Sequence, residues 1–147
     1  MDTNTKITII SAFVAIISAI VAYRSYKQNT KTYLISQTPI LMPRFNKTGD
    51  KYQFFTVNTH ISAVAKDVCI LLRGAKLTRI YTKENEFLPP NMQTFEIGID
   101  ENIDGAHFEI KYENIFRKRV QVVGTVHEMT SGRLDFQNIN FTIEGIN

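Results

Sequence analysis

The stretch DENIDG carries the residue types of a calcium-binding loop at the correct spacing over its first half. Asp100, Asn102 and Asp104 would supply oxygen ligands, and Gly105 would allow the sharp turn that such a loop requires. The second half does not fit, because Lys111 stands where a bidentate glutamate is needed and the flanking residues alternate as strands do. We therefore predict a polar turn between two strands, with Gly105 at a positive φ angle.

The rest of the sequence contains no pattern that specifies a reaction. His60, His107 and His127 lie far apart, and none has a second ligand at metal-binding spacing. No serine or cysteine stands in a glycine-framed turn, and there is neither a phosphate-binding loop nor a dinucleotide fingerprint. Glu84 and Glu86 fall in a stretch rich in Asn and Pro, which indicates a solvated loop. We therefore expect no enzyme, no metal site and no cofactor.

The densest basic cluster in the second half of the chain consists of Arg117, Lys118 and Arg119. With Phe116 beside it, the cluster has the composition needed to grip a phosphate group of a small anionic ligand. The alternative is an exposed strand end with no ligand. We expect no nucleic-acid polymer as a partner.

The composition is that of one globular domain with one additional element, since the chain has 147 residues of which 21% are charged. Its single cysteine, Cys69, cannot form an internal disulfide, which weakly favours a reducing compartment. Because it stands inside the apolar stretch VCILL, we expect Cys69 to be a buried hydrophobic residue.

The additional element is an apolar run near the amino terminus. Between Lys6 and Arg24 lie seventeen residues without a charge, 7–23. As a helix this run would be about 26 Å long, close to the ~30 Å hydrocarbon core of a membrane. It is longer than the apolar region of a cleaved signal peptide, and it lacks a good small-x-small cleavage site. We therefore predict a single-pass anchor that is retained.

The residues that flank the run suit a membrane interface. Basic side chains that snorkel and tyrosines that favour the headgroup region stand at its two ends: Lys6, Tyr23, Arg24, Tyr26, Lys27 and Lys31. Most of these positive charges lie on the carboxyl side of the run. The positive-inside rule therefore places the amino terminus outside an inner membrane and the rest of the chain in the cytoplasm.

Four alanines of the run fall at alternating spacings of three and four: Ala12, Ala15, Ala19 and Ala22. They would share one face of a helix, and small residues on one face let helices approach closely in lipid. The alternative is that alanine is simply a common filler in membrane helices. The spacing therefore suggests helix association without requiring it.

The run continues without Gly or Pro until Pro39, so a helix can extend to about Gln37 before the residue preceding proline leaves the helical region. Beyond Pro39 the apolar residues alternate, as in half-buried strands. We divide the chain into a tail, a transmembrane helix, a basic stalk and a β-sandwich domain: 1–6, 7–23, 24–38 and 39–147.

Eight stretches of the domain have the alternation of a strand: 40–46, 51–59, 66–73, 77–83, 94–100, 106–112, 117–129 and 134–144. Pro43 confines the first of them to a sheet edge. The last changes its register midway, which a bulge near Gln137 and Asn138 would reconcile. Short turns separate the stretches and no helical pattern intervenes. We predict a mainly β fold, an antiparallel sandwich of seven or eight strands preceded by one long helix.

In layout the chain resembles a large, loosely related group of uncharacterised bacterial single-pass membrane proteins with a small β-sandwich. The stretches that carry this resemblance are FFTVNTHISAVAKDVCILL and IKYENIFRKRV, and His60 replaces the glycine expected in the first. The resemblance implies an immunoglobulin-like sandwich and a membrane location. It implies no activity.

Charge is divided unevenly along the chain. Residues 24–83 contain eleven Lys or Arg against two acids, and residues 84–147 contain five against eleven. The basic half would lie over anionic headgroups, or else the domain has two oppositely charged faces.

We expect a binding module that tethers a protein partner or self-associates at the membrane. One alternative is an extracytoplasmic surface or pilin-like filament subunit. A second is a membrane effector whose β domain senses a small anionic ligand such as a nucleotide.

Overall fold

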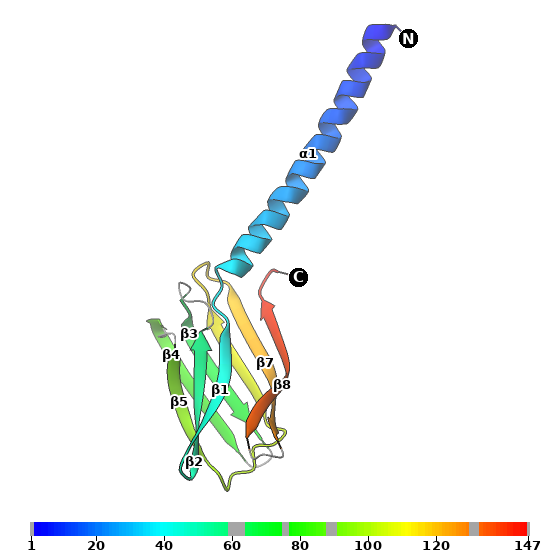
Figure 1. Ribbon diagram of the computed structural model, residues 1–147. Coiled ribbons are helices and arrows are strands. Elements are labelled where there is room, and N and C mark those ends of the chain that lie inside the picture. The colour runs from blue at the N-terminus through cyan, green and yellow to red at the C-terminus, as the bar shows by residue number, and fades with distance from the viewer. Residues whose placement is uncertain (1, 59–63, 75–76, 88–90, 130–132, 147) are drawn as a thin grey trace. The chain divides into compact units, whose positions relative to one another are not determined.

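A computed structural model describes residues 2–58, 64–74, 77–87, 91–129 and 133–146 (Figure 1). Within these residues the chain forms one helix, α1 (Thr3–Ser36), followed by eight strands. The strands are β1 (Leu41–Thr48), β2 (Lys51–Asn58), β3 (Lys66–Arg73), β4 (Thr78–Phe87), β5 (Asn91–Gly98), β6 (His107–Glu113), β7 (Arg119–Glu128) and β8 (Leu134–Ile143). Two compact units result, a helical one up to Ser36 and a β-rich one from Gln37 onward.

The helix α1 is continuous over 34 residues, which corresponds to about 51 Å. It begins where the carboxylate of Asp2 accepts the backbone N–H of Thr5 at 2.7 Å, as an N-cap does. It ends at Ser36, one residue before the limit expected from Pro39. None of its residues from Thr3 to Ser36 is buried, and Phe13 is 66% exposed. The apolar side chains of this helix are therefore not covered by any other part of the helical unit.

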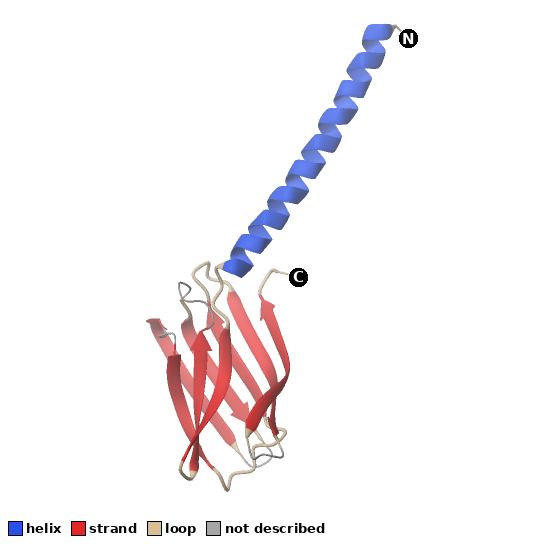
Figure 2. Ribbon diagram, in the orientation of Figure 1, coloured by secondary structure: helices blue, strands red, loops and turns tan. Residues whose placement is uncertain are grey.

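The β-rich unit is the predicted antiparallel sandwich (Figure 2). One sheet has three strands in the order β1-β2-β5, and the other has five in the order β4-β3-β6-β7-β8. The strand with Pro43, β1, lies at the edge of its sheet as predicted. The edges β1 and β8 meet where the rings of Phe45 and Phe136 stack with centroids 5.2 Å apart.

The core lies between the two sheets and follows the predicted alternation. In β6 the side chains of Phe108, Ile110 and Tyr112 are buried, whereas Glu109 and Lys111 lie on the outer face. Phe108 packs edge-on against Phe136 with ring centroids 5.2 Å apart. Because Phe45 of the three-stranded sheet also stacks on Phe136, aromatic rings from both sheets meet in the core.

The predicted bulge in β8 is confirmed. The register of β8 against β7 shifts between Val123 and Thr125, and Asn138 has a φ of 54°. The shift lets Phe136 and Phe141 both turn toward the core although they stand five residues apart.

The prediction that Glu84 and Glu86 lie in a solvated loop is wrong, because β4 continues to Phe87 and includes both residues. This part of the strand lies at a sheet edge, where polar side chains stay hydrated, so its composition resembles that of a loop.

The expectation of a buried Cys69 is also wrong. This residue is only half-buried and lies on the outer face of the five-stranded sheet, because its neighbours Val68 and Ile70 take the inward positions.

The uneven charge along the sequence does not produce two separate charged halves of the sandwich. Strand β5 from the acidic part pairs with β2 from the basic part, and β6 pairs with β3 in the same way. The fold thus interleaves the two parts.

Candidate functional site

A connected set of buried polar groups lies where the chain enters the sandwich. Residues 37–40, which we call the neck, lead from the last turn of α1 into β1. Thr38 is 1% exposed and Pro39 is also buried, which is unusual for a connecting segment. The side chains that hold the neck are Tyr112 at the end of β6 and Asn114 just beyond it.

Tyr112 closes one side of this site. Its hydroxyl donates a hydrogen bond to the backbone carbonyl of Pro39, and its ring lies in the core. Burial raises the pKa of Tyr112 well above its usual value, so the phenol stays protonated and remains a donor.

Asn114 closes the other side and is 3% exposed. Its amide nitrogen donates to the hydroxyl oxygen of Thr38 at 2.8 Å. Its amide oxygen accepts the backbone N–H groups of Phe116 and Lys118, both at 3.0 Å. One buried side chain therefore joins the neck to the β6–β7 turn, residues 114–118. We call Thr38, Pro39, Tyr112 and Asn114 the neck clamp.

The neck clamp is suited to holding rather than to reacting. Its groups are a protonated phenol, an amide, a hydroxyl and a carbonyl, each engaged by another member of the clamp or by the turn. Buried polar groups that are satisfied in this way fix one geometry, because releasing any of them leaves a buried donor or acceptor unpaired. The clamp therefore fixes the point at which the neck joins the sandwich.

The neck clamp could not be predicted from the sequence. Its two hydrogen bonds join residues that are 73 and 76 positions apart, so no local pattern reveals them. The sequence contains only weak signals of it: Tyr112 falls on the inward face of its strand, and the stretch IKYENIFRKRV ends that strand in a turn.

The basic cluster does not converge on one pocket. Arg117, with a φ of 56°, and Lys118 belong to the β6–β7 turn, whereas Arg119 begins β7. Of the three, only Arg119 lines a hollow of about 710 Å³ on the outer face of the five-stranded sheet. The carboxylates of Glu113 and Glu144 line the same hollow, which makes it poorly suited to a small anion.

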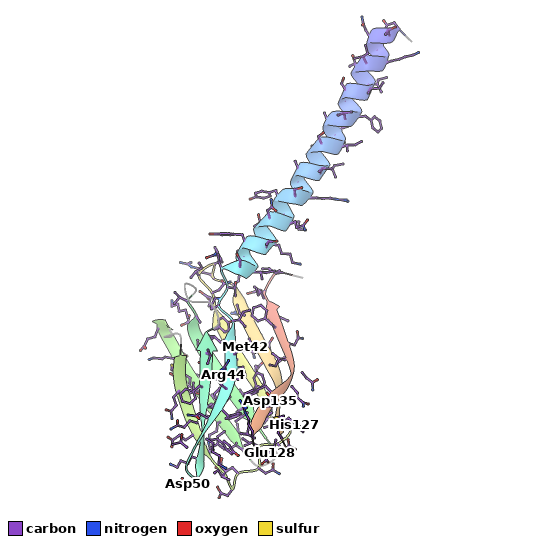
Figure 3. The ribbon with its side chains drawn as sticks, in the orientation of Figure 1. Met42, Arg44, Asp50, His127, Glu128 and Asp135 are labelled. Carbon is purple, nitrogen blue, oxygen red and sulfur yellow. The ribbon has the colours of Figure 1, made fainter. Side chains whose placement is uncertain are left out.

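The calcium-like stretch forms the predicted polar turn, and Gly105 has the predicted positive φ, at 73°. One carboxylate oxygen of Asp104 accepts the backbone N–H of Glu128 at 2.8 Å and lies 3.4 Å from Nδ1 of His127. Figure 3 shows His127 and Glu128 near the start of β8. In the described part of the chain, no three His, Cys, Asp or Glu side chains are grouped so as to hold a metal ion. His60 lies outside the described residues.

The predicted membrane residues all lie on α1, where they are exposed: Lys6, Tyr23, Arg24, Tyr26, Lys27 and Lys31. The four alanines lie on the same helix, at spacings that place them on one face. Within the described residues, α1 is the one helix long and apolar enough to cross a membrane.

Comparisons of the chain with protein-family models, with curated proteins and with solved structures find no match.

Proposed function

We propose that this chain is a bacterial inner-membrane protein whose β-sandwich is a binding module, anchored by α1 as an uncleaved signal-anchor and facing the cytoplasm. The observation that carries the proposal is the helix itself. Seventeen consecutive uncharged residues, 7–23, lie in a helix none of whose side chains is buried. Such a surface needs an apolar environment, and a bilayer supplies one.

The proposal of a binding module also draws on the strand order of the sandwich. The strand order β1-β2-β5 opposite β3-β6-β7 corresponds to strands A-B-E and C-F-G of an immunoglobulin domain, with β4 added beside β3 and β8 added beside β7. We infer an immunoglobulin-like sandwich on this basis. Fold likeness alone assigns no partner, so the partner is either another protein or a second copy of the chain.

Tethering gives the module its mechanism. An anchor confines every copy to a plane and raises the effective concentration for neighbours in the same plane. The neck clamp adds to this, because it fixes the end of the sandwich from which the tether leaves. Weak contacts between neighbouring sandwiches would then be sufficient for assembly.

Self-association can be tested through the alanine face of α1. Replacing Ala15 and Ala19 together with isoleucine is expected to weaken association in vesicles about tenfold, because larger side chains hold the helices apart. The measurement is energy transfer between donor-labelled and acceptor-labelled copies of the full chain as the protein-to-lipid ratio is varied.

The matched control adds bulk to the opposite face of the same helix, by Val14→Ile and Val21→Ile, and should leave association unchanged. Energy transfer that is equal in the two variants would exclude the alanine face. An absence of transfer for the unmodified chain would exclude self-association and leave binding to a different protein.

A further inference from the structure

The β6–β7 turn presents an apolar and basic surface at the end of the sandwich where the chain enters. Ile115 at its tip is 53% exposed, and Arg117 is also exposed. Lys118 and the partly buried Phe116 complete the turn, and the exposed Arg119 follows it. Apolar and basic side chains in one short segment are the combination that anionic membrane surfaces attract.

Within the residues that the structure describes, the three cations of this surface form no ion pair. Among the described residues, no carboxylate lies within ion-pair distance of Arg117, Lys118 or Arg119. Arg117 and Lys118 also lie outside the hollow that contains Glu113 and Glu144. The charge of Arg117 and Lys118 is therefore available to an external anion, whereas Arg119 shares its hollow with these two carboxylates.

The position of the turn is fixed relative to the neck. Asn114 donates to Thr38 at 2.8 Å, and Thr38 stands two residues beyond Ser36, the last residue of α1. Two residues of chain span at most about 7 Å. Covalent connection and one hydrogen bond thus hold the turn close to the helix end whatever angle the sandwich adopts.

The length of α1 brings this end close to the headgroups. From Ala15, the midpoint of the apolar run, to Ser36 the helix extends about 31 Å. The outer limit of the headgroups lies about 20 to 22 Å from the membrane midplane. An upright helix therefore ends about 10 Å above the headgroups, and an average tilt lowers it further. That separation is about one Debye length.

We propose that the β6–β7 turn is a second membrane contact, in which Arg117 and Lys118 bind anionic lipid headgroups, Arg119 adds positive charge beside them, and Ile115 faces the interface. This inference rests on the proposed membrane anchor. It assigns the basic cluster to lipid rather than to a soluble ligand.

The test uses the full chain with Cys69→Ser and one new cysteine, Ile115→Cys, that carries an environment-sensitive fluorophore. The chain is reconstituted into phosphatidylcholine vesicles with or without phosphatidylglycerol, each containing a trace of lipid spin-labelled at the headgroup. We expect the label to be quenched about twofold more strongly in the anionic vesicles, because the headgroups attract the cations of the turn. The control label, Asp50→Cys, is on the β1–β2 turn at the opposite end of the sandwich (Figure 3) and should not respond.

A triple variant, Arg117→Gln, Lys118→Gln and Arg119→Gln, should abolish the additional quenching of the label at position 115. The matched triple Lys47→Gln, Arg73→Gln and Arg133→Gln should retain it. Equal quenching at positions 115 and 50 would overturn the proposal. Quenching at position 115 that is the same in neutral and anionic vesicles, and the same in the triple variant, would also overturn it. Loss of the quenching on adding inorganic phosphate at constant ionic strength would also overturn it, in favour of a soluble anion. Failure of the chain to float with vesicles would instead contradict the membrane anchor.

Discussion

Replacing Asn114 with alanine is expected to lower the free energy of unfolding of the sandwich by about 2 to 4 kcal/mol. The side chain is buried and makes three hydrogen bonds, one to the neck and two within the β6–β7 turn. Alanine would leave the backbone N–H groups of Phe116 and Lys118 without their acceptor, and the Thr38 hydroxyl without its donor. The cost of unpaired buried groups exceeds the net value of the hydrogen bonds themselves.

The measurement is denaturant unfolding of the full chain in a mild detergent, followed by the circular dichroism of the strands. Asn140→Ala is the matched control, because Asn140 is exposed on β8 and should change the free energy by no more than about 0.5 kcal/mol. Tyr112→Phe removes only the hydroxyl of the second clamp residue and should cost about 1 to 2 kcal/mol. Equal stabilities of the Asn114 and Asn140 variants would show that the clamp does not hold the neck.

Replacing Gly124 with alanine is expected to cost about 3 kcal/mol, at the upper end of the usual cost of overpacking a core. A Cβ at this position would lie 2.6 and 2.7 Å from two ring atoms of Phe108 and 2.9 Å from the backbone oxygen of Gln137. The ring is fully buried and packs edge-on against Phe136. Neither the ring nor the backbone of β8 can move away without opening the centre of the sandwich.

The matched control is Gly74→Ala, because a Cβ at that position meets its nearest atom at an ordinary 3.5 Å. This change should leave the midpoint of denaturant unfolding close to that of the unmodified chain. Adding Phe108→Leu to Gly124→Ala should recover part of the loss, so that the double variant is more stable than the sum of the single effects predicts. Strict additivity of the two changes would contradict the proposed clash.

The strands could be predicted from the sequence because each carries its own alternation. In β6, Phe108 and Ile110 face the core and Lys111 faces outward, as the period of two requires. The bulge at Asn138 was predictable for the same reason, since the pattern itself changes phase there. Local periodicity was therefore sufficient to predict the strands.

The predictions that were wrong concern residues whose burial or secondary structure depends on their position in the sheet rather than on the local sequence pattern. The apolar stretch VCILL has the composition of a fully buried segment. Only every second residue faces the core, however, which leaves Cys69 on the outer face. The polar end of β4 resembles a loop because an edge strand tolerates Glu84 and Glu86. The neck clamp joins Thr38 to Asn114, 76 positions apart in the sequence, and single-sequence periodicity contains no information on such a pair.

The central claim, a sandwich anchored at the cytoplasmic face of an inner membrane, is tested most directly by thiol labelling. The chain carries Cys69→Ser and a single cysteine at the exposed β1–β2 turn, Asp50→Cys. Bacterial cells producing it are treated with a membrane-impermeant thiol reagent before and after permeabilisation, and the membranes are then washed at alkaline pH. We predict that the protein stays in the washed membranes and is labelled only after permeabilisation. Labelling of intact cells, or loss of the protein from the washed membranes, would contradict this account.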